Sequence, residues 1–184
     1  MRSITAVVAV LALSAPVLAG QGFRVTSTDV EQGKTLKSAQ VFNGMGCTGA
    51  NTSPALAWTG APAGTKSFAV TIYDPDAPTG SGWWHWIIFN IPSDTTSLPA
   101  GAGKPEGGGA PQGSIQSMTD FGQPGYGGPC PPPGDKPHRY IFTVYALKTD
   151  QIPLQKDVSG AMVGFYLNQN VLKKASFTAK YGRK

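Results

Sequence analysis

Charged side chains are scarce in this chain of 184 residues and make up only 14% of it. Basic residues outnumber acidic ones, giving a formal net charge of +5, but they are scattered apart from Lys173-Lys174 and the tail from Lys180 to Lys184. A nucleic-acid-binding surface usually carries a clustered basic stripe with interleaved aromatic side chains, and this sequence has none. We therefore expect no nucleic acid among the partners.

Long apolar runs are missing after the N-terminus. A short basic start is followed by an uncharged, mostly apolar run from Ile4 to Leu18 and then by the small residue Ala19, which is the layout of a secretory signal peptide. We predict a signal peptide over residues 1–19, with cleavage after Ala19. No later segment approaches the roughly 20 apolar residues that a helix needs to cross a bilayer, so we expect no membrane span.

Export without an anchor predicts a periplasmic or secreted, soluble protein. No cysteine closely follows the apolar run, which argues against a lipid anchor. The remaining 165 residues, 20–184, are enough for a single domain whose core needs no metal for stability.

Cysteine is nearly absent: Cys47 and Cys130 are the two in the chain, and they form no Cys-x-x-Cys motif. In an oxidising compartment, an even pair indicates one disulfide. Closing a loop of this length would stabilise the fold by about 4 kcal/mol in the chain-entropy model. Two free, buried thiols are the alternative.

Glycine and proline are abundant, with 24 and 16 residues, which indicates many turns and a mainly β domain rather than a helical bundle. The apolar runs predict the following strands: 23–25, 41–42, 56–58, 67–73, 83–91, 114–118 and 140–147. The run at 67–73 is almost continuously apolar, as is typical of a strand covered on both faces.

The remaining segments are predicted to be loops and one helix. Residues 43–51 and 100–137 are rich in glycine, the second also in proline, and a loop as long as 100–137 is usually functional or disordered. We predict a helix over 159–174, capped by Ser159, with an apolar face of Met162, Phe165, Tyr166 and Leu172. Residues 175–181 are either a last strand or a tail.

The two histidines of the chain lie in two short motifs. One is Asp74-Pro75-Asp76-Ala77-Pro78 followed by Trp84-His85-Trp86, and the other is Gly128-Pro129-Cys130-Pro131-Pro132 followed by His138-Arg139-Tyr140. Each motif borders a predicted strand. We expect four polar side chains to meet at one end of a sheet and form a small pocket: Asp74, His85, His138 and Tyr140.

Strand alternation places His85 on one face with Trp83, Ile87 and Phe89, and directs Trp84 and Trp86 to the other, toward a core or a dimer surface. By the same rule, the second strand shares a face among four residues: His138, Tyr140, Phe142 and Val144.

The predicted pocket has the chemistry of an anion receptor. A carboxylate such as Asp74 beside an imidazole raises the pKa of the histidine, which would give two cationic donors in addition to the Tyr140 hydroxyl. Glycines at 127 and 128 would let backbone N–H groups approach a bound anion. Together these features point to a tetrahedral oxyanion, such as a phosphate ester.

Each feature also has a structural alternative. Asp-Pro-Asp-Ala-Pro is a good turn sequence, and His85 and Tyr140 could be hydrogen-bonded core residues. Asn51-Thr52-Ser53 matches a glycosylation sequon, but Pro54 follows, and we expect Asn51 to order a turn. A metal site or a hydrolase could also use two histidines and an aspartate; no G-x-S-x-G or H-E-x-x-H motif supports this.

The two motifs resemble those of the phosphatidylethanolamine-binding protein family, in particular its bacterial, Raf-kinase-inhibitor-like branch. The stretches that carry the resemblance are FAVTIYDPDAPTGSGWWHWIIFNIP and GYGGPCPPPGDKPHRYIFTVYAL. Thr79 and Trp86 depart from the pattern common in that family. The resemblance implies a mainly β fold, with a central antiparallel Greek-key sheet, a smaller sheet and a C-terminal helix.

The resemblance also implies a function and a site. On matching positions, the ligand-binding residues are Asp74, Pro75, His85, Gly128, Pro129, His138 and Tyr140. It implies a non-enzymatic protein with no cofactor or metal that binds phosphate-bearing head groups or an anionic partner, and bacterial relatives suggest a homodimer. An exported protein would not meet a kinase of its own cytosol. The alternatives are an exported protein that modulates signalling proteins of another cell and a phosphoester hydrolase.

Overall fold

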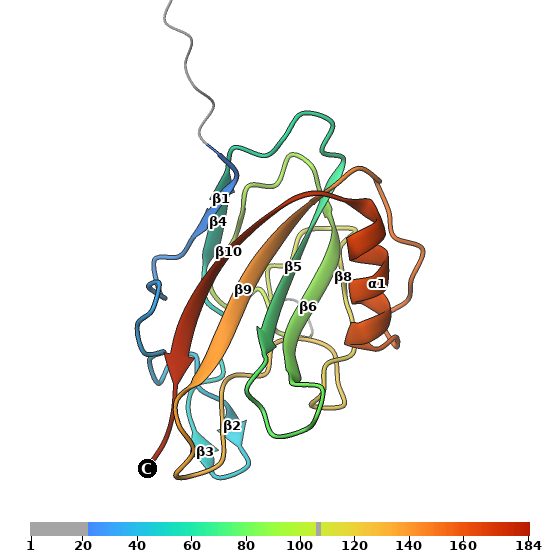
Figure 1. Cartoon of the computed structure of the whole chain (residues 1–184). Coiled ribbons are helices and arrows are strands. Elements are labelled where there is room, and N and C mark those ends of the chain that lie inside the picture. The colour runs from blue at the N-terminus through green and yellow to red at the C-terminus, as the bar shows by residue number, and fades with distance from the viewer. Residues whose placement is uncertain (1–21, 106–107) are drawn as a thin grey trace, which may run out of the picture.

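The computed structural model describes residues 22–105 and 108–184, so the predicted signal peptide lies outside the described residues. Strands dominate the described chain, which contains one helix (Figure 1). In chain order the elements are β1 (Arg24–Thr26), β2 (Asn43–Gly44), β3 (Cys47–Thr48), β4 (Leu56–Thr59), β5 (Ser67–Asp74), β6 (Trp83–Pro92), β7 (Ser97–Leu98), β8 (Ile115–Gln116), β9 (His138–Leu147), α1 (Gly160–Asn170) and β10 (Val171–Tyr181).

A five-stranded antiparallel sheet in the order β10-β9-β5-β6-β8 forms the centre of the fold. Within it, β9 returns beside β5 and gives the order β9-β5-β6-β8, which is a Greek-key arrangement. A three-stranded sheet, β1-β4-β7, and the small β2-β3 hairpin complete the fold. The predicted mainly β class, with a central and a smaller sheet, is confirmed.

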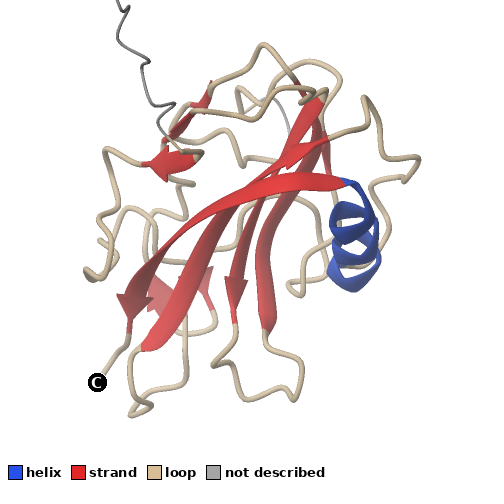
Figure 2. Cartoon of the chain, turned by 45° about the horizontal axis from the view of Figure 1, so that its top comes forward, coloured by secondary structure: helices blue, strands red, loops and turns tan. Residues whose placement is uncertain are grey.

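Apolar side chains cover both faces of the central sheet. On one face Phe68 and Phe142 pack in a large core with Trp58 of β4, and on the other Ile87 packs with Val163 of α1. Figure 2 shows the helix against one side of the sheet. Nearly every residue of β5 is buried, as its continuous apolar sequence predicts. None of the described helices is long and apolar enough to cross a membrane.

The C-terminal helix is shorter than predicted. Ser159 caps α1, accepting a hydrogen bond from the Met162 amide at 3.3 Å as expected, but the helix ends at Asn170 and the chain continues directly into β10. Pairing of β10 with β9 along its length overrides the helical pattern of 171–174. The predicted apolar face is also wrong: Phe165 is 58% exposed, and Val163 is buried instead.

Several short elements also differ from the prediction. Residues 41–42 form no strand, whereas the predicted loop at 43–51 contains the β2-β3 hairpin. The strand predicted over 114–118 is limited to two residues, and β9 begins two residues early, at His138. The predicted disulfide is confirmed: Cys47 of β3 is bonded to Cys130, with 6.0 Å between their Cα atoms.

Candidate functional site

A cavity of about 380 Å³ lies where β5, β6 and β9 meet the loops at one end of the central sheet. Four polar side chains on its wall are those predicted to meet there: Asp74, His85, His138 and Tyr140. Apolar side chains line most of the remainder, including Met45, Trp83, Phe121, Pro131, Pro132 and Pro133, and the polar side chains of Thr79 and Arg183 complete it. The cavity therefore combines a polar end with apolar walls.

A β-bulge in β6 aims His85 at this cavity. Successive pairs of the β5-β6 ladder are Ile72 with Trp86 and Tyr73 with Trp84, so β6 has one additional residue, His85, between them. A bulge of this kind bends the strand and changes where its side chains point.

The bulge overturns the simple alternation expected for β6. Trp86 lies in the same core as Tyr140, whereas Ile87 and Phe89 lie in the core against α1. The expectations that His85 shares a face with Ile87 and Phe89, and that Trp86 points away from it, are therefore wrong. On β9 the expected alternation holds, with Tyr140, Phe142 and Val144 in one core.

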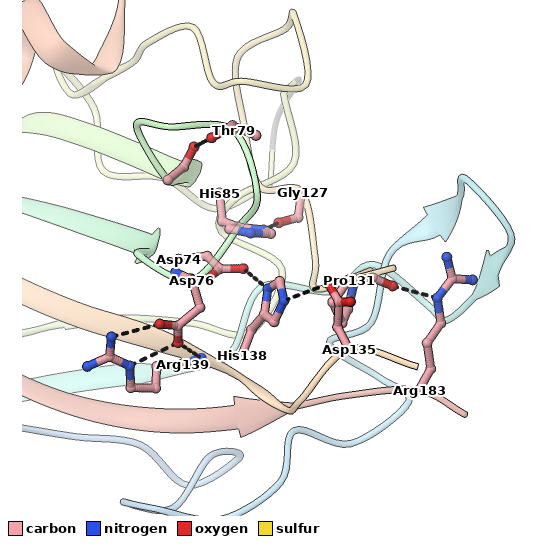
Figure 3. Close-up of polar contacts among 11 residues, drawn as sticks. Asp74, Asp76, Thr79, His85, Gly127, Pro131, Asp135, His138, Arg139 and Arg183 are labelled. Atoms are coloured by element: carbon pink, nitrogen blue, oxygen red, sulfur yellow. Dashed lines mark hydrogen bonds and ion pairs between the residues drawn. The ribbon is translucent and has the colours of Figure 1, made fainter. Parts of the chain in front are cut away.

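His138 is held between two carboxylates (Figure 3). Its Nδ1 donates to Oδ2 of Asp74 at 2.8 Å, and its Nε2 lies 3.4 Å from Oδ2 of Asp135. The other oxygen of Asp74 accepts a hydrogen bond from the Asp76 amide at 2.8 Å. Asp74 and His138 are both buried, so this pair anchors the loop after β5 to the start of β9.

Asp76 adds a second link between that loop and β9. Its two oxygens accept hydrogen bonds from the Arg139 guanidinium at 2.7 and 2.9 Å. These bonds lower the pKa of Asp76 to about 2. The Asp-Pro-Asp sequence thus serves the structure and the cavity wall together.

His85 has a different environment from the one predicted. Its Nδ1 donates to the Gly127 carbonyl at 2.7 Å (Figure 3). The side chain is buried and forms part of the cavity wall. Burial is the main reason that the pKa of His85 is lowered to about 4. The expected rise in the pKa of this histidine is wrong, because loss of hydration outweighs the attraction of Asp74.

The Tyr140 side chain is 1% exposed, and its hydroxyl has no hydrogen-bond partner among the described residues. Its ring lies perpendicular to that of His85, with 5.1 Å between ring centroids. Burial raises the pKa of Tyr140, and the charge of Asp74 raises it further. The group stays a neutral hydroxyl, able to donate one hydrogen bond.

Pro75, Gly128 and Pro129 do not line the cavity, although the motif places them beside it. The Gly127 and Gly128 amides are already used: they donate to the His85 carbonyl at 2.8 Å and to Oδ1 of Asn51 at 2.7 Å. The prediction that these N–H groups approach an anion is therefore wrong.

Gly128 has a packing role instead, because a Cβ there would clash with the Gln40 carbonyl oxygen. Asn51 also donates to the Tyr126 carbonyl and has a positive φ of 49°, so it orders a turn as expected.

Comparison with known sequences decides the family. The sequence profile of the phosphatidylethanolamine-binding protein family matches residues 26–182. The chain belongs to this family. It is 55% identical over 159 residues to the UPF0098 protein YbcL of Escherichia coli, covering 86% of this chain and 87% of that protein. It is 52% identical over 158 residues to YbhB of the same organism, covering 86% and 99%.

Solved structures agree with this assignment. The crystal structure of E. coli YbcL, described as a new member of the mammalian PEBP family, matches with a TM-score of 0.87 and 54% identity over 89% of this chain and all of that one. A PEBP homologue from Chlamydia trachomatis, CT736, matches with a TM-score of 0.73 and 25% identity, covering 89% and 99%.

Arg183 lines the cavity just beyond the segment matched by the family profile, and sequence reasoning missed it. Its guanidinium donates to three carbonyl oxygens: that of Pro131 at 2.6 Å, that of Gly46 at 3.0 Å and that of Met45 at 3.4 Å. It joins the β2-β3 hairpin to the proline-rich wall. No motif marks this residue, because its partners are backbone atoms far away in the sequence.

Phe121 was missed for a different reason. It lies within the long loop at 100–137 and contacts the rings of Trp83 and His85, with centroid distances of 5.4 Å in both cases. Its aromatic type was visible in the sequence, but the path of the loop was not. Among the described residues, no group of three or more histidine, cysteine or acidic side chains could hold a metal ion.

Proposed function

We propose that this member of the family is a non-enzymatic binding protein that takes a phosphate-bearing group, such as a phospholipid head group, in the cavity lined by Asp74, His85, His138 and Tyr140. The observation that carries the proposal is the unpartnered Tyr140 hydroxyl. A buried polar group nearly always has a hydrogen-bond partner, and this one is on the wall of a cavity. A ligand oxygen would supply the missing partner.

The apolar walls support a ligand with a carbon portion. Trp83 and Phe121 form one edge-to-face aromatic pair at 5.4 Å, and prolines 131–133 lie on the cavity wall. An organic phosphate could place its phosphoryl group against the polar end and its carbon atoms against these side chains. The family takes its name from phosphatidylethanolamine, a phospholipid, and this supports the same class of ligand.

We also propose that the protein acts in the periplasm or outside the cell. The supporting features are the signal-peptide pattern of residues 1–19 and the disulfide, which suits an oxidising compartment. Expression of the full chain in a bacterium should yield an exported protein that has lost its first 19 residues, as mass spectrometry of the fractionated cells would reveal. An uncleaved chain in the cytoplasm would contradict this.

The binding proposal is tested by NMR titration with phosphate and with phosphoethanolamine, following the imidazole signals. With His85 and His138 as the only two histidines, assignment is simple. We expect both imidazoles to shift together and saturate, with weaker binding in Tyr140→Phe. If neither signal moves at millimolar ligand, the cavity is not a phosphate site and a protein partner should be sought.

A further inference from the structure

The outer side of α1 is apolar although it faces solvent. On the inner side of the helix, Val163 and Leu167 pack against the central sheet. On the outer side, Met162 is 47% exposed and Phe165 is 58% exposed, and no residue of Gly160–Asn170 is charged. Figures 1 and 2 show α1 on the flank of the molecule. A helix that is apolar all round is normally buried all round, so we expect another surface to cover this side.

The apolar side continues into the start of β10. The β9-β10 ladder shifts its register between Val171 and Lys173, which leaves Leu172 as an additional residue at a bulge. The Leu172 side chain is 42% exposed. Three of the four large apolar side chains that are exposed in the described residues therefore lie on α1 or directly after it. We call Met162, Phe165 and Leu172 the α1 surface, and such a cluster marks an interaction site.

Three lysines lie at the C-terminal end of α1. Lys173 and Lys174 follow in β10, and the Lys148 amide donates to the Asn170 carbonyl at 2.9 Å. All three side chains are exposed, and none forms an ion pair with a described residue. Lys174 donates to Oδ1 of Asn168 on α1 at 2.7 Å, which holds its charge beside the helix.

The acidic residues near α1 leave this positive charge in excess. Asp150, which follows Lys148 closely in the sequence, lies 3.4 Å from Lys66 and is paired with it. At the other end of α1, the neighbours Lys156 and Asp157 have opposite charges. The α1 surface is therefore uncharged along the helix and basic at one end.

A bilayer with anionic lipids complements this arrangement. Its interface takes up exposed aromatic and aliphatic side chains, and its surface potential attracts lysines beside them. A second copy of the chain fits less well, because a two-fold contact through α1 would bring two sets of three lysines into one interface, where like charges oppose association.

We propose that the α1 surface docks this protein on a bilayer that contains anionic phospholipids. Met162, Phe165 and Leu172 enter the boundary between head groups and acyl chains, and the three lysines face the lipid phosphates. The contact is peripheral and reversible, because the inserted apolar area is small. The inference goes beyond the proposed function, since the α1 surface shares no residue with the cavity.

Flotation of the processed protein, residues 20–184, with vesicles tests the inference. We expect binding to vesicles of phosphatidylcholine mixed with phosphatidylglycerol, weakening as the salt concentration rises, and little binding to phosphatidylcholine alone. Phe165→Gln should weaken binding about tenfold. Lys173→Gln/Lys174→Gln should weaken it about 30-fold at low salt, or about fivefold for each lysine.

Two matched controls should bind as the native protein does. Lys34→Gln/Lys37→Gln removes two exposed lysines that are outside the α1 surface, and Gln169→Ala changes an exposed polar residue of the same helix. All the variants change exposed side chains, so urea unfolding should show native stability. Equal weakening by the two lysine pairs would show attraction to charge alone and overturn the inference.

Other outcomes would also overturn it. These are no binding to the anionic vesicles, full binding by Phe165→Gln, and a dimer in sedimentation that Phe165→Gln dissociates. Release of the protein by excess soluble phosphoethanolamine would assign the vesicle contact to the cavity instead. The proposed function is judged separately, because Phe165→Gln should keep the native imidazole shifts with phosphoethanolamine. Loss of those shifts in the native protein would contradict the proposed function and leave the α1 surface untouched.

Discussion

The two histidines of the chain differ in the atoms that face them. His138 has a carboxylate at each nitrogen, whereas His85 has a backbone carbonyl at one nitrogen and a cavity beside the other. The sequence placed both next to strand ends and predicted that they meet. The sequence could not show that the His85 ring is buried and hydrogen-bonded to a carbonyl, because this depends on the position of the loop that contains Gly127.

The burial of His85 predicts a loss of stability in mild acid. Its pKa is near 4 in the folded protein and near 6.5 when the chain is unfolded, so the unfolded state binds the proton first. The contribution is fully present above about pH 6.5 and is lost as the pH falls toward 4, by on the order of 3 kcal/mol in the free energy of unfolding. Urea unfolding across this range should show the decline in the native protein and a shallower one in His85→Gln. Equal slopes would assign the proton to another group.

Removal of the Tyr140 hydroxyl should separate stability from binding. The group is buried without a partner, so its removal leaves no other polar group unpaired. Tyr140→Phe should therefore change the free energy of unfolding by less than about 1 kcal/mol. The affinity for phosphate should fall about tenfold, as expected when one hydrogen bond to a charged group is lost. A loss of several kcal/mol in stability would instead mean that the hydroxyl is bonded within the protein.

At the scale of elements, the long strands could be predicted from the sequence, but the directions of their side chains could not. Apolar runs ended by proline predict β5 and β6 within a residue or two. The residue types around His85 do not indicate the bulge, because it arises from how β5 and β6 pair. For the same reason, the start of β10 was predicted to be helical. Residues 171–174 are compatible with a helix or a strand, and their pairing with β9 makes them a strand.

The C-terminal segment after β10 should hold the cavity wall in place through Arg183. Replacing it by alanine removes hydrogen bonds to the carbonyls of Met45, Gly46 and Pro131. We expect Arg183→Ala to cost about 2 kcal/mol in stability, to speed amide hydrogen exchange in the β2-β3 hairpin and to weaken phosphate binding several-fold. The neighbouring exposed residue offers the control Lys184→Ala, which should change none of these. Matching effects in both variants would indicate loss of charge rather than loss of the three contacts.

At the scale of the whole molecule, the cavity lies where one end of the central sheet meets the β2-β3 hairpin, the loop after β5 and the long segment at 100–137. The segment at 100–137 has the length of a functional or disordered loop and ends beside the second histidine motif, and it supplies Phe121 and the proline-rich wall. Its route could not be predicted, because it follows contacts such as the Tyr126 hydroxyl donating to the Gln40 carbonyl at 2.8 Å. The disulfide was predictable, since the chain has one possible pair.

That disulfide should stabilise both the fold and the cavity. Cys130 lines the cavity, and Cys47 lies on the hairpin whose tip reaches the cavity through Met45. The bond joins residues 83 positions apart. In urea unfolding, the free energy of unfolding of the double variant Cys47→Ser/Cys130→Ser should therefore be about 4 kcal/mol lower than that of the native protein. Phosphate binding, measured under conditions where the variant is fully folded, should weaken because the hairpin and the wall are then joined mainly through Arg183. The reduced native protein should behave like the variant. Unchanged affinity in a folded variant would show that the disulfide serves stability alone.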